Sequence, residues 1–76
     1  MKSLTPLLRV MQNLVTGPRD WYRIEHCKTG KGKPYFSVRI CVWRDDWPVY
    51  SDGESVHFSQ AIAQAIEGIE EADNAG

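Results

Sequence analysis

Apolar and polar residues alternate most regularly between Pro34 and Arg44. The even-numbered positions of this stretch are apolar, namely Phe36, Val38, Ile40 and Val42. The odd-numbered positions are polar or aromatic, namely Tyr35, Ser37, Arg39, Cys41 and Trp43. Because successive side chains of a β-strand point to opposite faces, this period of two predicts a strand with one core face and one wetter face. We place this strand at the centre of a small antiparallel sheet.

A helix is predicted over residues 5–16, ahead of the strands. Thr5 can cap its N-terminus, and Pro6 suits the first helical position, where a missing N–H costs nothing. Gly17-Pro18 would end it. Its apolar residues recur at helical spacing and form one stripe, made of Leu4, Leu7, Leu8, Met11, Leu14 and Val15.

The first strand is predicted over residues 20–28, and residues 28–33 then form a turn with two glycines. The residues expected on its core face are Tyr22, Ile24 and His26, and those expected on the other face are Trp21, Arg23, Glu25 and Cys27. Centring the hairpin on Gly32 sets Glu25 opposite Arg39, Ile24 opposite Ile40 and Trp21 opposite Trp43. Centring it on Lys31 sets Arg23 opposite Arg39, an unfavourable pair of like charges. We therefore favour the first register.

The second half of the chain predicts a third strand and a second helix. Asp45-Asp46 makes a turn before a strand at Trp47–Ser51, which Pro48 assigns to a sheet edge because proline cannot donate a ladder hydrogen bond. Asp52-Gly53 indicates another turn, and residues 56–58 extend or re-form the strand. Ser59 is expected to cap the second helix. Its buried stripe is Phe58, Ile62, Ala65, Ile66, Ile69 and Ala72.

The predicted order is therefore α-β-β-β-α in a single domain of residues 1–76, with residues 1–4 and 73–76 frayed. Each helix has one apolar stripe and the sheet has one apolar face, so both helices are expected on that face, in a two-layer α+β sandwich with a three-stranded antiparallel sheet. The opposite face would be bare, unless Trp47 and the termini fold over part of it. It would show Trp21, Arg23, Tyr35, Arg39, Cys41 and Trp43.

The charges are divided along the chain. All nine Lys and Arg residues lie in residues 1–44, with two acidic residues, which gives that part a formal charge of +7. Residues 45–76 carry eight acidic residues and no Lys or Arg, a formal charge of −8. Such asymmetry favours charged partners, although the two halves could instead neutralise each other within the fold.

The composition also bounds the setting of the protein. Two cysteines are too few for a disulfide scaffold, and no apolar stretch is long enough to span a membrane, so we expect a cytoplasmic protein. A chain of 76 residues has little room for a deep enzyme pocket, and no nucleophile–base set is visible. We expect no catalytic residue, no cofactor and no small-molecule substrate. The residues His26, Cys27, Cys41 and His57 lack zinc-site spacing, so no metal is expected.

The element order resembles the double-stranded-RNA-binding domain over roughly residues 5–70. The residues that carry this resemblance are Pro6-Leu7-Leu8, Tyr22, the Gly-Lys-rich turn, Phe36 to Ile40, Tyr50 to Gly53, Ala61, Ala65 and Ile66. That family has a lysine cluster at the start of its second helix, and residues 56–62 contain no lysine. The resemblance therefore implies RNA contact through the first turn, at Lys28, Lys31 and Lys33. The stretch from Tyr35 to Ile69 also resembles, more weakly, small antitoxins of the HicB kind.

Two functions of different classes follow. The first is a non-enzymatic nucleic-acid-binding module, with RNA favoured over DNA, in which exposed lysines and flexible backbone amides of the turn hold phosphate and bare-face aromatics stack on bases. Its candidate residues are Arg23, Lys28, Lys31, Lys33, Tyr35, Arg39, Trp43 and Arg44.

The alternative is a small protein-binding regulator or inhibitor. The bare face, which carries the aromatic and arginine residues that protein interfaces use, would contact a protein complex or a second copy in a homodimer. The acidic residues Glu67, Glu70 and Glu71 of the second helix would assist. Accessory proteins of phages and mobile elements, including inhibitors of bacterial defence complexes, are similar in style.

Overall fold

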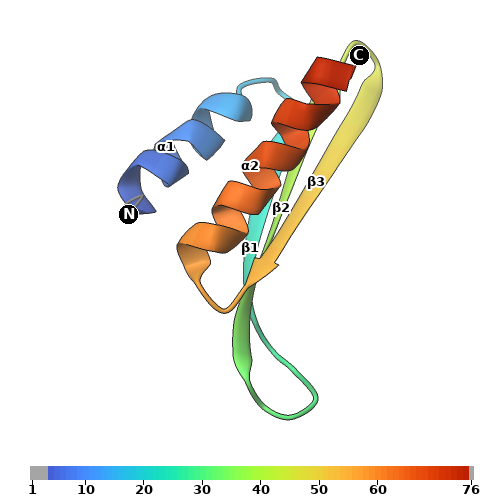
Figure 1. Cartoon of the computed structure of the whole chain (residues 1–76). Helices are drawn as coiled ribbons and strands as arrows, with labels where there is room; N and C mark the ends of the chain where they lie inside the picture. Colours follow the sequence, from blue (N-terminus) through green and yellow to red (C-terminus); the bar gives the residue numbers. More distant parts are fainter. Residues whose placement is uncertain (1–3, 76) are drawn as a thin grey trace.

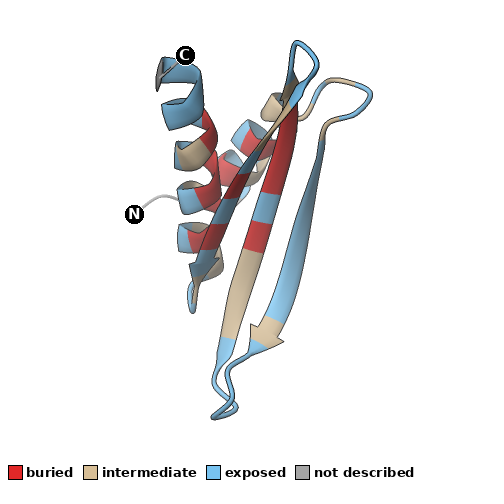
Figure 2. Ribbon diagram, turned by 90° about the vertical axis from the view of Figure 1, so that its right-hand side faces the viewer, coloured by how far each residue is buried: buried red, intermediate tan, exposed pale blue. Residues whose placement is uncertain are grey.

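The computed structural model describes residues 4–75, with the side chains of residues 5–74 (Figure 1). Its elements are α1 (Leu4–Leu14), β1 (Trp21–Lys28), β2 (Pro34–Arg44), β3 (Trp47–Ser55) and α2 (Phe58–Ala75). The strands form one antiparallel sheet in the order β1-β2-β3, and both helices lie on the same face of it (Figure 2). The predicted α+β sandwich is confirmed, as is the edge position of β3. No helix within the described residues is long and apolar enough to cross a membrane.

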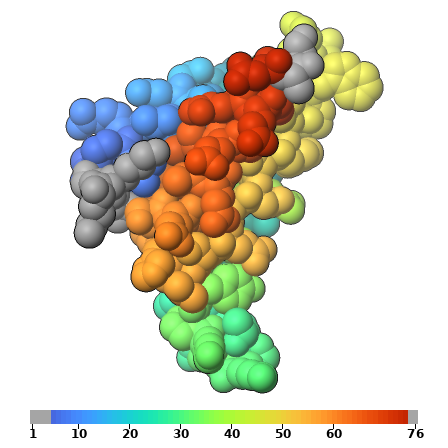
Figure 3. Space-filling model, viewed as in Figure 1, coloured from blue at the N-terminus to red at the C-terminus, as the bar shows by residue number. Residues whose placement is uncertain are grey.

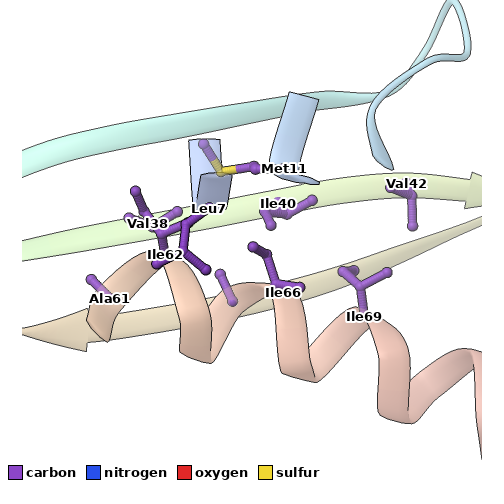
Figure 4. Packing of buried hydrophobic residues seen from close by; sticks show 10 residues of the cluster. Leu7, Met11, Val38, Ile40, Val42, Ala61, Ile62, Ile66 and Ile69 are labelled. Carbon is purple, nitrogen blue, oxygen red and sulfur yellow. The ribbon is translucent and has the colours of Figure 1, made fainter. Parts of the chain in front are cut away.

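The core forms where the apolar positions of β2 meet the two helices. Val38, Ile40 and Val42 are fully buried, as the period of two predicts. They pack against residues of both helices, namely Leu7, Met11, Ala61, Ile62, Ala65, Ile66 and Ile69 (Figure 4). Towards the hairpin, the ring of Phe36 stacks on those of His26 and Phe58, with centroids 4.8 and 4.9 Å away.

The helical layer covers the sheet unevenly. Helix α2 packs on β3 and β2, and α1 packs on α2. Strand β1 is left largely uncovered, so Tyr22 and Ile24, which we expected in the core, are 36% and 37% exposed. The alternation assigned them to the correct face, but it does not show how far the helices reach across that face.

Strand β3 is one continuous strand, and the prediction of a turn at Asp52-Gly53 is wrong. Gly53 pairs with Val38 in the middle of the ladder. A Cβ atom at this position would collide with the carbonyl oxygen of Ala61 and would lie 2.9 Å from the backbone nitrogen of Ala65. Glycine is therefore present because the backbone of α2 passes directly over β3, and not because the chain reverses there.

The favoured register of the first hairpin is also wrong, because Arg23 lies opposite Arg39 and Trp21 opposite Cys41. The turn sets this register. The N–H of Gly32 donates to the carbonyl of Thr29 at 2.8 Å, and the N–H of Thr29 donates to the carbonyl of Lys33 at 2.9 Å. Gly32 has a φ of 81°, the left-handed conformation that closes a three-residue hairpin loop.

In this register Arg23 and Arg39 lie opposite each other, and each of them pairs with an acidic residue. The Nε atom of Arg23 lies 2.7 Å from an oxygen of Glu25, and that of Arg39 lies 2.6 Å from an oxygen of Asp52. The repulsion between Arg23 and Arg39 was our reason for favouring the other register, and these acidic partners largely neutralise it.

The ends of the helices differ slightly from the prediction. Helix α1 ends at Leu14, and α2 begins at Phe58, with the carbonyl of His57 accepting the N–H of Ala61 at 3.1 Å. Ala72, expected in the buried stripe, is exposed. The expected fraying falls partly on residues 1–3 and 76, outside the described residues. Of the others, Leu4 belongs to α1, and residues 73–75 belong to the last turn of α2.

Candidate functional site

The eight candidate nucleic-acid residues do not lie together. Lys28, Lys31 and Lys33 are at the end of the β1–β2 hairpin, which we call the lysine tip. Arg23, Tyr35, Arg39 and Trp43 project from the sheet face opposite the helices, which we call the open face. Arg44 lies at the far end of β2, where it contacts α2. The sequence prediction therefore assigned to one site residues that lie on three separate surfaces.

The lysine tip extends beyond the rest of the fold. The last pair between β2 and β3 is Phe36 with Ser55, so the hairpin beyond Phe36 has only two strands. Figure 3 shows this part standing clear of α2 and β3. All three lysines are exposed. Among the described residues, none of the three takes part in an ion pair.

The backbone of the lysine tip is held by Thr29. Its hydroxyl accepts the N–H of Lys31 at 3.3 Å and the N–H of Lys33 at 3.1 Å. We had expected free backbone amides that bind an anion, but the amides of Lys31 and Lys33 are occupied by this hydroxyl. An anion at the lysine tip would meet the lysine ammonium groups.

The arginines differ from the lysines because each candidate arginine has an acidic partner. Arg39 makes two hydrogen bonds to Asp52, of 2.6 and 3.3 Å, which raise the pKa of Arg39. Arg44 makes two to Asp73, of 2.9 and 3.0 Å, which raise the pKa of Arg44 and lower that of Asp73. With the pair of Arg23 and Glu25, the open face carries mixed charges instead of a basic surface.

These charges surround a small hollow at the centre of the open face. It has a volume of about 140 Å³. Its lining alternates basic and acidic residues around a serine, namely Arg23, Glu25, Ser37, Arg39, Asp52 and Glu54. A polyanion would find no net attraction at this point.

Aromatic residues of the open face gather beyond the charges, at the end away from the lysine tip. Trp21 and Tyr50 make an edge-to-face pair with centroids 6.3 Å apart, on either side of Cys41. Cys41 is only 1% exposed although it belongs to this face. The guanidinium of Arg19 lies 4.1 Å from the ring centre of Trp43. Tyr50 and Arg19 were not among the predicted residues, and the corrected register of the first hairpin is what brings Trp21 beside Cys41 and so near Tyr50.

Tyr35 lies apart from this aromatic group, next to the lysine tip. It is half-buried, and hydrogen bonding with the Cys27 side chain raises the pKa of its hydroxyl. With Thr29, Glu54, Ser55 and Val56 it lines an open hollow of about 410 Å³. Trp47, which could have covered the open face, instead lies opposite Arg44 on the helix side and is 76% exposed.

The acidic residues Glu67, Glu70 and Glu71 of α2 are exposed, as a charged partner would require, and their spacing of three and four residues places them on one side of the helix. Glu67 and Glu70 line a hollow of about 200 Å³ between the two helices, together with Leu7, Val10, Ala63 and Ile66. Glu71 does not contribute to it. Both cysteines are free, and the described residues contain no group of three or more His, Cys, Asp or Glu side chains that could hold a metal ion.

A comparison with protein-family models, curated proteins and solved structures finds no match to this chain.

Proposed function

We propose that the chain binds nucleic acid, with RNA as the preferred ligand, through Lys28, Lys31 and Lys33. The observation that carries this proposal is the contrast between the lysines of the tip and the arginines of the sheet and its adjoining loops. Arg19, Arg23, Arg39 and Arg44 each pair with an acid, whereas the three lysines of the tip have no acidic partner among the described residues. Their charge is therefore available to a ligand.

The surroundings of the lysine tip favour a polyanion. Helix α2 begins at the end of the sheet from which the hairpin projects (Figure 1), and it has no acidic residue in its first turn. The first turn of α2 therefore adds no negative charge that would oppose the lysines. Lysines bind phosphates as point charges, so the contact is with the backbone of the nucleic acid and carries little sequence preference.

The opposite end of the molecule would repel the same ligand. The turn between β2 and β3, with Asp45 and Asp46, lies there beside the C-terminal end of α2, which carries Glu70, Glu71 and Asp73 (Figure 1). The division of charge along the sequence therefore becomes a division in space, with the lysine tip at one end of the molecule and this acidic group at the other. A nucleic acid would be bound at the hairpin end only.

Fluorescence anisotropy with labelled duplex RNA, single-stranded RNA and duplex DNA tests the proposal. A variant with Lys28→Ala, Lys31→Ala and Lys33→Ala should bind more weakly. The slope of log affinity against log salt should fall by roughly two to three, because each lost phosphate contact removes about one unit. The matched control carries Arg19→Gln, Arg39→Gln and Arg44→Gln, which remove three charges that are already paired, and it should keep most of the slope.

Two results would count against the lysine tip. The wild-type protein could fail to bind any of the three nucleic acids at low salt, which would remove the proposal. The arginine control could lose as much slope as the lysine variant, which would move the contact elsewhere. A higher affinity for duplex DNA than for RNA would overturn the preference alone.

The aromatic group of the open face favours a second candidate, a small regulator that binds a protein. Tryptophan, tyrosine and arginine dominate the binding energy of protein interfaces. This group consists of those types, namely Trp21, Trp43, Tyr50 and Arg19. A pull-down from lysate separates the two functions, because Trp43→Ala and Arg39→Glu should each abolish capture of a protein partner, while the lysine variant should retain it. We propose the cytoplasm as the setting for either function, in keeping with the two free cysteines.

A further inference from the structure

The sheet has two edges, and they are protected very differently. The edge strand β3 contains Pro48, and α2 packs closely along it. The edge strand β1 has eight residues with no proline or glycine, and its pairing with β2 runs from Trp21 to Lys28 without a bulge. Exposed edges of this kind pair readily with another strand, and most proteins block them.

The backbone groups that β1 offers can be assigned from the hairpin. The N–H of Thr29 donates to the carbonyl of Lys33, so Thr29 faces β2. Residues of an antiparallel strand alternate between facing one neighbour and the other. The N–H and C=O groups of Tyr22, Ile24 and His26 therefore face outward, away from β2.

We propose that two copies of this chain pair antiparallel through β1, with Ile24 opposite Ile24 of the second copy. The two three-stranded sheets would then form one continuous sheet with all the helices on one side. Ile24 lies on the symmetry axis with its backbone groups facing the second copy, and Tyr22 exchanges hydrogen bonds with the copy's His26. The side chains of Tyr22 and Ile24, left uncovered by the helices, would gain apolar neighbours.

The charges of β1 select both the partner and the register. In this register Arg23 lies opposite Glu25 of the second copy, twice by symmetry. Moving the axis one residue towards Trp21 would set Arg23 against its own copy, and moving it the other way would set Glu25 against its own copy. Only the register centred on Ile24 uses the outward backbone groups and sets opposite charges against each other.

The ion pair already present in each chain fits this arrangement. Arg23 and Glu25 lie on the same side of β1, with 2.7 Å between Nε and a carboxylate oxygen, and both side chains are about half exposed. In the dimer the two pairs would form a square in which each charge has opposite charges as neighbours. The two lysine tips would point in opposite directions, so dimerisation does not depend on their ligand.

Sedimentation velocity over a series of concentrations tests the dimer. The wild-type chain should pass from the mass of one chain to that of two. Arg23→Glu and Glu25→Arg should each raise the dissociation constant about tenfold, because each sets like charges opposite each other twice. A chain with both substitutions exchanges the charges and should return close to the wild-type value. A wild-type chain that stays monomeric at every concentration, or a combined variant as weak as the single ones, would overturn the proposal.

Disulfide cross-linking tests the register independently, in a chain carrying Cys27→Ser. Ile24→Cys places two thiols across the symmetry axis, and oxidation should give a covalent dimer. Tyr22→Cys is the matched control, since it is on the same face and equally exposed. In the proposed register its thiol is far from its own copy, beyond the roughly 7 Å between Cα atoms that a disulfide can bridge. Cross-linking of both variants, or of Tyr22→Cys alone, would contradict the register.

Discussion

Gly53 of β3 lies directly against the backbone carbonyl of Ala61 in α2, with no room for a Cβ atom between them. Ala61 and Ala65, two of the three residues of α2 nearest this glycine, are both fully buried. The small side chains on both elements allow the helix and the strand to approach closely. This contact fixes the position of α2 over the edge of the sheet that carries β3.

Gly53→Ala should therefore destabilise the fold by about 2–4 kcal/mol, because the added methyl group meets backbone that cannot rotate away. Urea unfolding followed by circular dichroism measures the change. Gly30→Ala is the matched control, since a Cβ atom at Gly30 would meet nothing within 4 Å. Its effect should stay within about 0.5 kcal/mol. Equal losses for the two variants would show that α2 does not lie this close to β3.

A second glycine, Gly68 of α2, makes a similar contact with a side chain. A Cβ atom at Gly68 would collide with the hydroxyl oxygen of Ser51 and would lie 2.9 Å from its Cβ atom. Gly68→Ala should lower the unfolding free energy by about 1–3 kcal/mol. Ser51→Gly in the same chain should recover part of that loss, measured by a double-mutant cycle in urea. Purely additive losses would contradict direct contact between these two residues.

The two glycine contacts illustrate what the sequence could not predict. Glycine in Asp52-Gly53 is typical both of a turn and of a strand crossed closely by another backbone, and only the position of α2 distinguishes the two. The alternation in β2 was sufficient to predict the core face, because it depends on neighbouring residues alone. Pro48 likewise indicated a sheet edge, because proline has no N–H to donate to a neighbouring strand.

The candidate site was harder to predict than the fold, because the charge of an arginine depends on residues far along the chain. Arg39 is paired with a residue 13 positions away and Arg44 with one 29 positions away. Both acids come from the negative half of the sequence, so the two halves do partly neutralise each other. The lysine tip differs because a short projecting hairpin meets few other side chains, and its charges could be assigned from local sequence.

Asp20 connects the loop after α1 to the end of β2. Its carboxylate accepts the N–H of Gly17 at 2.9 Å and the N–H of Trp43 at 2.8 Å. These bonds, the one from Gly17 first, lower the pKa of Asp20 below its usual value of 3.8. A group whose pKa is lowered by folding stabilises the protein above its unfolded pKa, and this stabilisation disappears as the pH falls through the folded pKa.

Asp20→Asn should accordingly cost about 1–2 kcal/mol of unfolding free energy near pH 7, and the difference from wild type should shrink at about pH 2. Urea titrations at the two pH values measure it. Asp46→Asn is the control, because it removes the same charge from a side chain that is 98% exposed. A difference for Asp20→Asn that is the same at both pH values would show that the carboxylate does not act through its charge.

The rings of Trp21 and Tyr50 shield Cys41, and this shielding can be measured by thiol chemistry. Cys41 is 1% exposed and Cys27 is half-buried, so an aromatic disulfide reagent should modify Cys27 in the folded protein and Cys41 only slowly. Trp21→Ala should open the face above Cys41 and speed its modification by roughly tenfold or more, while the rate at Cys27 stays unchanged. Peptide mapping after timed quenching assigns the two rates.

Because Trp21 belongs to the exposed surface and not to the core between sheet and helices, thermal unfolding of the variant should stay cooperative. Rapid modification of Cys41 in the wild-type protein would mean that the two rings do not cover it.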